Sequence, residues 1–263
     1  MLKYSTICIL GGLLYIFLLI YDGCNRSSPI LNVPGIVLTF DDSSIDEWFN
    51  ILPLLESFSM KATFFLTDIA SIGNEEIKKL RIIQESGHEI ASHGYTHIDP
   101  ILYIKENGVL EYIKGEILPA KDFLTMNGFH QESFAFVHGI RNKKIDKELI
   151  SIFPNIRGVS ETQRHKRIQR IQNVKDIYFD QGCQQIIRGF CIDVIQEVNI
   201  EQIKYILKKT KRENKIIVFY AHTPKENTSK GKWEVKIDFL KEVFKIVNEM
   251  EIKSFRFRDI NHV

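Results

Sequence analysis

Three short polar stretches in this sequence each follow an apolar run, and their side chains are of the kinds that bind metals and transfer protons. Asp41 and Asp42 end the run "GIVLTFDD". His93 and His97 stand four positions apart in "SHGYTH", and His222 lies in "YAHTP". Two histidines and one carboxylate around a common point suit Zn²⁺ with an open position for water, although other divalent metals accept the same ligands. The three stretches predict a hydrolytic metal site if the fold brings them together.

Two adjacent carboxylates at the end of a buried strand repel each other unless a cation holds them. A metal bound by one of them would supply that charge. Because successive strand residues point to opposite sides, the second carboxylate need not be a ligand, and it could take a proton from water activated by the metal. His222 would then be the general acid on the opposite side. The alternative, exposed loop histidines beside a helix-capping aspartate, leaves the paired acids without a reason.

Apolar runs that alternate with helix-like segments form the frame for these residues. The expected strands are 35–40, 62–66, 88–92, 133–137, 156–160, 187–193, 215–220 and 253–257, and the expected helices are 46–58, 74–86, 107–127, 142–152, 199–213 and 235–250. This alternation predicts parallel β/α units, and seven or eight of them favour a barrel, closed or incomplete, over an open sheet. The carboxyl ends of barrel strands share one mouth, so the polar stretches are expected to converge there. Pro53 is expected to delay or kink the first helix.

The same stretches resemble the motifs of a known family. The segments "TFDD" (39–42), "SHGYTH" (92–97) and "IIVFYAHTP" (216–224) look like the first, second and fifth motifs of the polysaccharide deacetylases, the NodB-homology group. The resemblance runs from about Gly35 to Phe257. It implies an α/β fold, a distorted and often incomplete (β/α) barrel of seven to eight units. It also implies a hydrolase that uses a divalent metal, most simply Zn²⁺, to remove N- or O-acetyl groups from a glycan.

Carried over residue by residue, the resemblance implies specific roles for the five polar residues. Asp41 is implied as the catalytic base and His222 as the catalytic acid. Asp42, His93 and His97 are implied as the metal ligands.

The third motif departs from the family pattern. Ala135 stands where the family commonly has an arginine that orients the base, and His138 stands in the place of an aromatic residue. The backbone N–H of His138 is expected to serve the oxyanion. Arg157, on the next expected strand, is a candidate to replace the missing guanidinium, although a lone arginine is more often a surface cation.

The fourth motif is weaker, and the two tryptophans are of different kinds. Asp193 follows a strand-like run and either tunes His222 or caps the helix expected over 199–213. Trp48 is expected to pack in the core. Trp233 lies in a loop beyond His222, where it either stacks on a substrate sugar or is an ordinary exposed side chain.

The N-terminal residues predict export. An uncharged apolar stretch, Ser5 to Tyr21, is long enough for a signal or a short membrane anchor over residues 1–22. A linker over 23–34 and a deacetylase-like domain over 35–263 are expected to follow. The domain is therefore expected on the periplasmic or cell-surface face, anchored to the membrane by a helix or, through a cysteine of the linker, as a lipoprotein.

Two other functions stay open at this point. A related metallo-amidohydrolase acting on a non-sugar amide would keep the same metal site. A non-catalytic glycan-binding member of the family would explain the missing arginine, but the complete set of base, ligands and acid argues against it. The formal net charge of +2 gives no support for nucleic acid as a partner.

Overall fold

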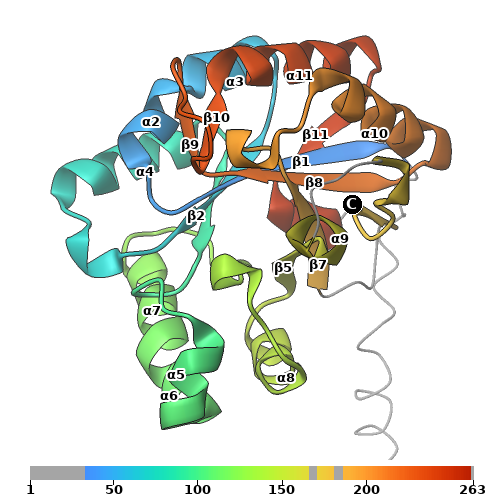
Figure 1. Ribbon diagram of the computed structural model, residues 1–263. Coiled ribbons are helices and arrows are strands. Elements are labelled where there is room, and N and C mark those ends of the chain that lie inside the picture. The colour runs from blue at the N-terminus through green and yellow to red at the C-terminus, as the bar shows by residue number, and fades with distance from the viewer. Residues whose placement is uncertain (1–32, 166–170, 181–185, 262–263) are drawn as a thin grey trace, which may run out of the picture.

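Seven parallel strands close into a barrel with helices on its outside (Figure 1). The computed structural model describes residues 33–165, 171–180 and 186–261. In order around the ring, the strands are β1 (Gly35–Asp41), β2 (Ala62–Leu66), β3 (Glu89–Ser92), β4 (Ser133–Ala135), β5 (Asn155–Val159), β7 (Ile186–Cys191) and β8 (Ile216–Ala221). The pairing of β1 with β8 closes the ring. The α/β barrel expected from the sequence is confirmed, in a closed seven-stranded form.

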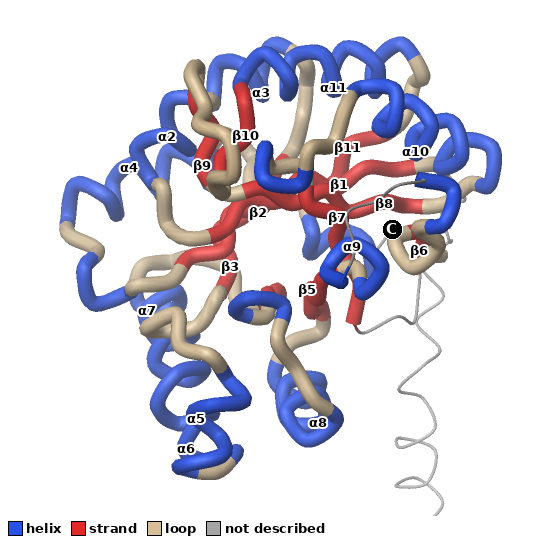
Figure 2. The backbone as a smooth tube through the Cα atoms, viewed as in Figure 1, coloured by secondary structure: helices blue, strands red, loops and turns tan. Residues whose placement is uncertain are grey.

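The helices surround the strands and connect most of them (Figure 2). They are α2 (Ile45–Asn50), α3 (Leu52–Ser57), α4 (Asn74–Glu85), α5 (Pro100–Asn107), α6 (Val109–Tyr112), α7 (Leu118–Met126), α8 (Lys143–Ile152), α9 (Glu161–His165), α10 (Ile200–Glu213) and α11 (Ile237–Glu249). The first expected helix is interrupted at Ile51, next to Pro53, as predicted. The helix expected over 107–127 is divided by a π-helical turn, Ile113–Ile117, and α5 was not foreseen.

Among the described residues, four further strands lie outside the ring. β11 (Lys253–Phe255) pairs with the first half of β1, where β2 has not yet begun. The strand expected over 253–257 is therefore an addition to the barrel and not an eighth member of it. β6 (Tyr178–Phe179) runs antiparallel to β8, and β9 (Thr223–Lys225) and β10 (Glu234–Lys236) form a separate pair.

The alternation of side chains along β1 positions the paired carboxylates. Ile36, Leu38 and Phe40 pack in the core between the barrel and the outer helices, whereas Val37 belongs to the core inside the barrel. Because neighbouring strand residues face opposite sides, Asp41 shares the inward face with Val37. Asp42 comes after the last strand residue and is free to take a loop conformation.

The predicted anchor over residues 1–22 and nearly all of the predicted linker over 23–34 lie outside the described residues, and both stay predictions. In the part of the chain that the structure describes, no helix has the length and apolar character needed to cross a membrane.

Candidate active site

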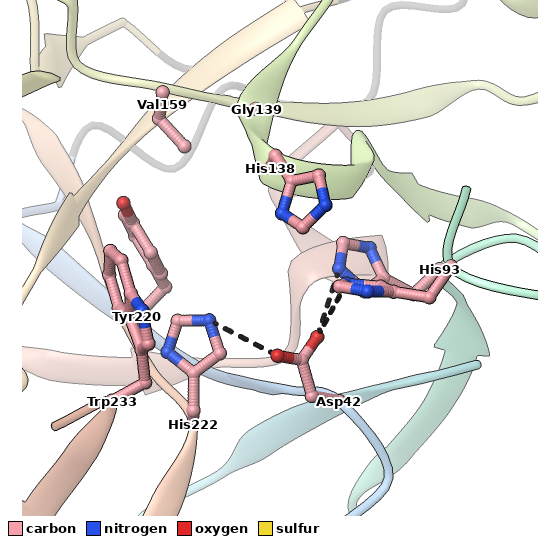
Figure 3. Close-up of a pocket in the computed structure, with 9 residues that line it drawn as sticks. Asp42, His93, His138, Gly139, Val159, Tyr220, His222 and Trp233 are labelled. Atoms are coloured by element: carbon pink, nitrogen blue, oxygen red, sulfur yellow. Dashed lines mark ion pairs between the residues drawn. The ribbon is translucent and has the colours of Figure 1, made fainter. Parts of the chain in front are cut away.

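The three polar stretches meet at the carboxyl ends of the barrel strands, around a cavity of about 340 Å³ (Figure 3). Its walls include Asp42, His93, His97, His138, His222 and Trp233. These residues follow β1, β3, β4 and β8 or lie in the loop before β10. The fold therefore brings together residues that are up to 191 positions apart in the sequence, from Asp42 to Trp233, as the strand-end argument predicted.

Asp42, His93 and His97 form a compact group of ligand atoms. Oδ1 of Asp42 lies 3.4 Å from Nε2 of His93 and 3.0 Å from Nε2 of His97. All three ligand atoms lie within 4.8 Å of one another. Asp42 and His97 both adopt left-handed backbone conformations, with φ of 72° and 61°, and residues other than glycine accept such strain mainly at functional sites. The group has the composition and the spacing of a metal site.

Electrostatics within this group favour a positive charge. Burial alone would raise the pKa of Asp42, but the two imidazoles beside it hold that pKa well below its usual range. Burial alone would also lower the pKa of His97, yet the carboxylate of Asp42 raises it.

Two sets of hydrogen bonds hold the loop that follows β3 and carries His93 and His97. Nδ1 of His93 donates to the carbonyl oxygen of Ala135 at 2.9 Å, which leaves Nε2 to face Asp42. The carboxylate of Glu116 accepts from the backbone N–H of Tyr95 (3.1 Å) and of Thr96 (2.9 Å) and from the Thr96 hydroxyl (2.6 Å). Glu116 lies in the π-helical turn and is only 5% exposed. The role of Glu116 was not predicted from the sequence, because a glutamate in a helical segment is normally exposed to solvent.

Asp41 is not among the residues that line the cavity, and it is paired with an arginine. Its side chain is nearly buried, and Oδ2 accepts a hydrogen bond from Arg157. Oδ1 has no hydrogen-bonding partner among the described residues. Arg157 is 1% exposed, so the interpretation of this residue as a surface cation is wrong. Its burial follows from β5, where it faces inward as Asp41 does on β1.

The barrel interior is shaped to contain the guanidinium. Arg157 lies over the rings of Tyr220 (4.6 Å to the centroid) and Phe65 (5.3 Å). A β-carbon on Gly189 would lie 2.9 Å from the Tyr220 ring and 3.3 Å from Cδ of Arg157. The absence of a side chain at Gly189 therefore makes room for the arginine. Ala135 is the direct neighbour of Arg157 across the β4–β5 ladder, so the guanidinium comes from one strand beyond the position that the family pattern favours.

His222 is paired with Asp193, which is fully buried. Nδ1 of His222 donates to Oδ2 of Asp193 at 2.5 Å, and the backbone N–H of His222 donates to Oδ1 at 3.1 Å. Burial would lower the pKa of His222, but the carboxylate of Asp193 raises it. Nε2 lies 3.6 Å from Oδ2 of Asp42. Of the two interpretations of Asp193, contact with His222 is the one observed, since the helix expected over 199–213 is capped by Asn199.

The remaining predicted residues differ in exposure. Trp48 is fully buried, as expected, and its Nε1 donates to the carbonyl oxygen of His222 at 3.3 Å. Trp233 is 49% exposed, and its ring lies 4.9 Å from that of His222. His138 adopts φ of 52° after β4, and its ring contacts the His97 ring. Burial and the nearby His97 lower the pKa of His138.

Two sequence comparisons match parts of the chain. A family model described as polysaccharide deacetylase matches residues 31–149, a range that contains both aspartates and the two histidines of "SHGYTH". Over 83 residues the chain is 36% identical to a bifunctional xylanase/deacetylase from Pseudobutyrivibrio xylanivorans. The match covers 29% of this chain and 13% of the length of that protein.

Several solved structures share the fold over most of the chain. A CE4 esterase from Streptococcus mutans has a TM-score of 0.55 at 18% identity, covering 86% of this chain and 87% of that one. A family 4 carbohydrate esterase from Streptomyces lividans, in complex with acetate, has a TM-score of 0.52 at 14% identity, with 84% and 91% covered. A CE4 family pseudoenzyme from Bacillus anthracis has a TM-score of 0.52 at 14% identity, with 88% and 66% covered.

At these identities the structural likeness is one of fold, while the family model matches the sequence of the first half of the barrel. The two findings agree with each other and with the motifs at the strand ends. Over residues 31–149 the chain is similar to the polysaccharide deacetylase family, and its barrel has the fold of the CE4 esterases.

Proposed function

We propose that this protein is a metal-dependent hydrolase that removes N- or O-acetyl groups from a carbohydrate. One observation carries the proposal. The Asp42, His93 and His97 ligand atoms lie within 4.8 Å of one another, at a mouth to which one carboxylate–arginine pair and one carboxylate–histidine pair also belong. A hydrolysis needs an activated water, a base and an acid, and the mouth has a candidate for each.

The three ligands fit a divalent cation. Oδ1 of Asp42 is buried, and Nε2 of His93 and Nε2 of His97 lie 3.4 Å and 3.0 Å from it, so the three ligand atoms converge on one point that a cation can occupy. The Nδ1–H of His93 is bound to a carbonyl, an arrangement that fixes the tautomer of metal-binding histidines. Two nitrogens and one oxygen suit Zn²⁺ with an open position. When bound, such a cation would lower the pKa of a water molecule and polarise the acyl carbonyl.

Asp41 is the proposed base. Arg157 donates a hydrogen bond to Oδ2, so Oδ1, which lacks a partner among the described residues, is the atom that takes the proton from water. The water oxygen forms the new bond to the acyl carbon. The backbone N–H of His138 is proposed to stabilise the negative charge that develops on the acyl oxygen.

His222 is the proposed acid. Its Nδ1–H is held by Asp193, so Nε2 is the atom that faces the cavity. The carboxylate of Asp193 raises the pKa of the ring and so favours its protonated form. That proton passes to the nitrogen or oxygen of the sugar as its bond to the acyl carbon breaks, and the products are acetate and a free amine or hydroxyl group.

We further propose that residues 1–22 hold this domain at the outer face of a membrane, where an acetylated envelope glycan is the substrate. The support is the uncharged apolar stretch that begins near the N-terminus.

A non-catalytic role is the second candidate, because one protein of the same fold is described as a pseudoenzyme. The presence of the proposed base, acid and three ligands in one mouth favours catalysis over this alternative. A metallo-amidohydrolase acting on a non-sugar amide would need the same five residues.

One experiment separates these functions. The protein is purified without chelators, its metal content is measured, and acetate release from acetylated chito-oligosaccharides is followed before and after chelation and after Zn²⁺ is added back. Stoichiometric metal and acetate release that Zn²⁺ restores are expected. Metal without acetate release from any glycan would contradict the carbohydrate assignment, and absence of metal would contradict the mechanism.

A further inference from the structure

His138 is a cavity residue whose side chain has no role in the mechanism proposed above. It lies in the short turn Val137–Gly139 after β4 and has φ of 52°, and Gly139 follows with φ of 64°. A β-carbon on Gly139 would lie 2.4 Å from the side chain of Val159, so the turn accommodates only glycine there. Two successive left-handed residues direct the His138 ring over the cavity (Figure 3).

The His138 ring lies next to the metal ligands without belonging to them. Its centroid is 4.6 Å from that of His97, and the rings meet edge to face at 73°. The group of possible ligand atoms contains Asp42, His93 and His97, and His138 is not part of it. A substrate whose acyl group reaches the metal ligands would therefore pass His138 on its way.

The polar atoms of the His138 ring are available for a ligand. The residue is exposed, and within the described ranges neither ring nitrogen takes part in a hydrogen bond or an ion pair. A neutral imidazole offers one donor and one acceptor. A hydroxyl group, which both donates and accepts, is the simplest partner for it.

Another part of the cavity wall is apolar. Trp233 exposes 49% of its surface, and Val159 and Tyr220 also line the cavity. At about 340 Å³, the cavity is at the small end of the range for ligand sites, about 300–1,000 Å³. An occupant with one flat apolar face and hydroxyl groups along its edge matches these walls, and a pyranose ring has both features.

We infer that the imidazole of His138 hydrogen-bonds a hydroxyl group of the sugar ring that bears the acetyl group. The inference rests on the proposed function, because it specifies how the same cavity selects its substrate. His138 is then a specificity-determining residue, which distinguishes an acetylated sugar from an acetyl ester that has no hydroxyl groups.

The test compares two substrates in the full-length, Zn²⁺-loaded protein and in the variants His138→Phe and His138→Gln. One substrate is an N-acetylated chito-oligosaccharide, and the other is 4-nitrophenyl acetate. Loss of one hydrogen bond of ordinary strength lowers the ratio of kcat/KM for the sugar to kcat/KM for the ester by about tenfold in His138→Phe, mainly through KM. His138→Gln retains a donor and an acceptor, so we expect it to recover most of the ratio.

A second measurement varies the sugar instead of the protein. Deoxy analogues that lack one ring hydroxyl group at a time are compared with the parent sugar. Wild type is expected to lose activity on one analogue, and His138→Phe is expected to treat that analogue and the parent alike.

An unchanged ratio in His138→Phe, or discrimination among the sugars as strong as in wild type, would overturn the inference. Reduced metal content together with equal losses on both substrates would identify His138 as support for the metal ligands, which also overturns it. Absence of glycan turnover by wild type would instead reject the proposed function itself.

Discussion

Two buried carboxylates belong to the cavity region, and each is paired with a cation from a different strand. Asp41 meets Arg157, and Asp193 meets His222. The carboxylates are alike in burial, at 3% and 0% exposed, but their partners differ in chemistry. Arginine keeps its proton at every physiological pH, whereas histidine changes charge near neutral pH.

The difference separates the two tasks of acid–base catalysis. A partner that never releases its proton can orient a base, but it cannot act as an acid. A partner that releases its proton near neutral pH can act as an acid, and the carboxylate beside it decides at which pH. In the proposed mechanism, the buried carboxylate of one pair is itself the base, and the buried carboxylate of the other pair raises the pKa of the acid.

The largest effect is expected from Arg157→Ala, which leaves the carboxylate of Asp41 buried and unpaired. Breaking a buried pair on one side costs about 3–5 kcal/mol, and a misoriented base lowers kcat by about 100-fold or more. Urea denaturation and steady-state kinetics measure the two effects. Arg141→Ala is the matched control, since its pair with Asp146 is partly exposed and is worth about 1 kcal/mol or less.

An arginine placed on the neighbouring strand is expected to restore part of the activity that Arg157→Ala loses. Ala135 and Arg157 are direct neighbours in the β4–β5 ladder, and both face the barrel interior. The double variant Ala135→Arg/Arg157→Ala is expected to regain about tenfold or more in kcat over Arg157→Ala, because distance from Asp41 matters and not the strand of origin. Equal activities of the single and double variants would show that β5 itself is required.

Asp193→Asn is expected to act mainly on the pH dependence of turnover. Asp193 raises the pKa of His222 against the effect of burial, and an amide cannot do so. The active acid is protonated, so activity falls as the pH rises through this pKa. In the variant, the alkaline fall moves to lower pH, and kcat at neutral pH decreases by about tenfold. A pH–rate profile with the same alkaline limb as wild type would contradict this assignment.

The Asp193–His222 pair is also expected to stabilise the folded protein, and more so at low pH than at high pH. Because the pKa of His222 is higher in the folded protein than the ordinary value of about 6.5, the pair stabilises the fold below that value. The stabilisation is lost as the pH rises through the raised pKa. The difference in free energy of unfolding between wild type and Asp193→Asn is therefore expected to shrink between slightly acidic and alkaline pH.

The smallest effect is expected from Gly189→Ala. The new methyl group would lie 2.9 Å from the Tyr220 ring and 3.3 Å from Arg157, so the arginine and the ring must shift. Overpacking of this kind costs about 1–3 kcal/mol. Gly158→Ala is the matched control, because its nearest contacts are at 3.8 Å. Equal stabilities of the two variants would show that Gly189 has no part in seating the arginine.

The convergence of the candidate metal ligands and the candidate acid could be predicted from the sequence, because it follows from the geometry of a parallel barrel. Asp42, His93 and His222 each follow a strand of a parallel unit, and all such strands end at the same mouth. Their convergence needs only the order of the elements. The positions of the barrel strands along the chain were also close to those expected, because apolar runs are local patterns.

The buried residues that support the site, Arg157, Glu116 and Gly189, could not be predicted in the same way. Whether Arg157 faces the barrel interior depends on the start of β5, and a shift of one residue turns the side chain outward. Glu116 reaches the backbone of Tyr95 and Thr96 from a π-helical turn, and no pattern of residue types predicts such a turn. The role of Gly189 depends on its close contacts with Tyr220 and Arg157, which only the folded structure shows. Contacts across the barrel, and not strand ends, decide these roles.

The most direct test of the account compares two neighbouring substitutions of equal size, Asp41→Asn and Asp42→Asn. Each variant is purified without chelators, and its zinc content and acetate release from an acetylated chito-oligosaccharide are measured. We predict that Asp42→Asn loses most of its zinc, whereas Asp41→Asn keeps stoichiometric zinc and loses turnover by about 100-fold or more. Zinc retained by Asp42→Asn, or full turnover by Asp41→Asn, would contradict the division of the paired carboxylates into ligand and base.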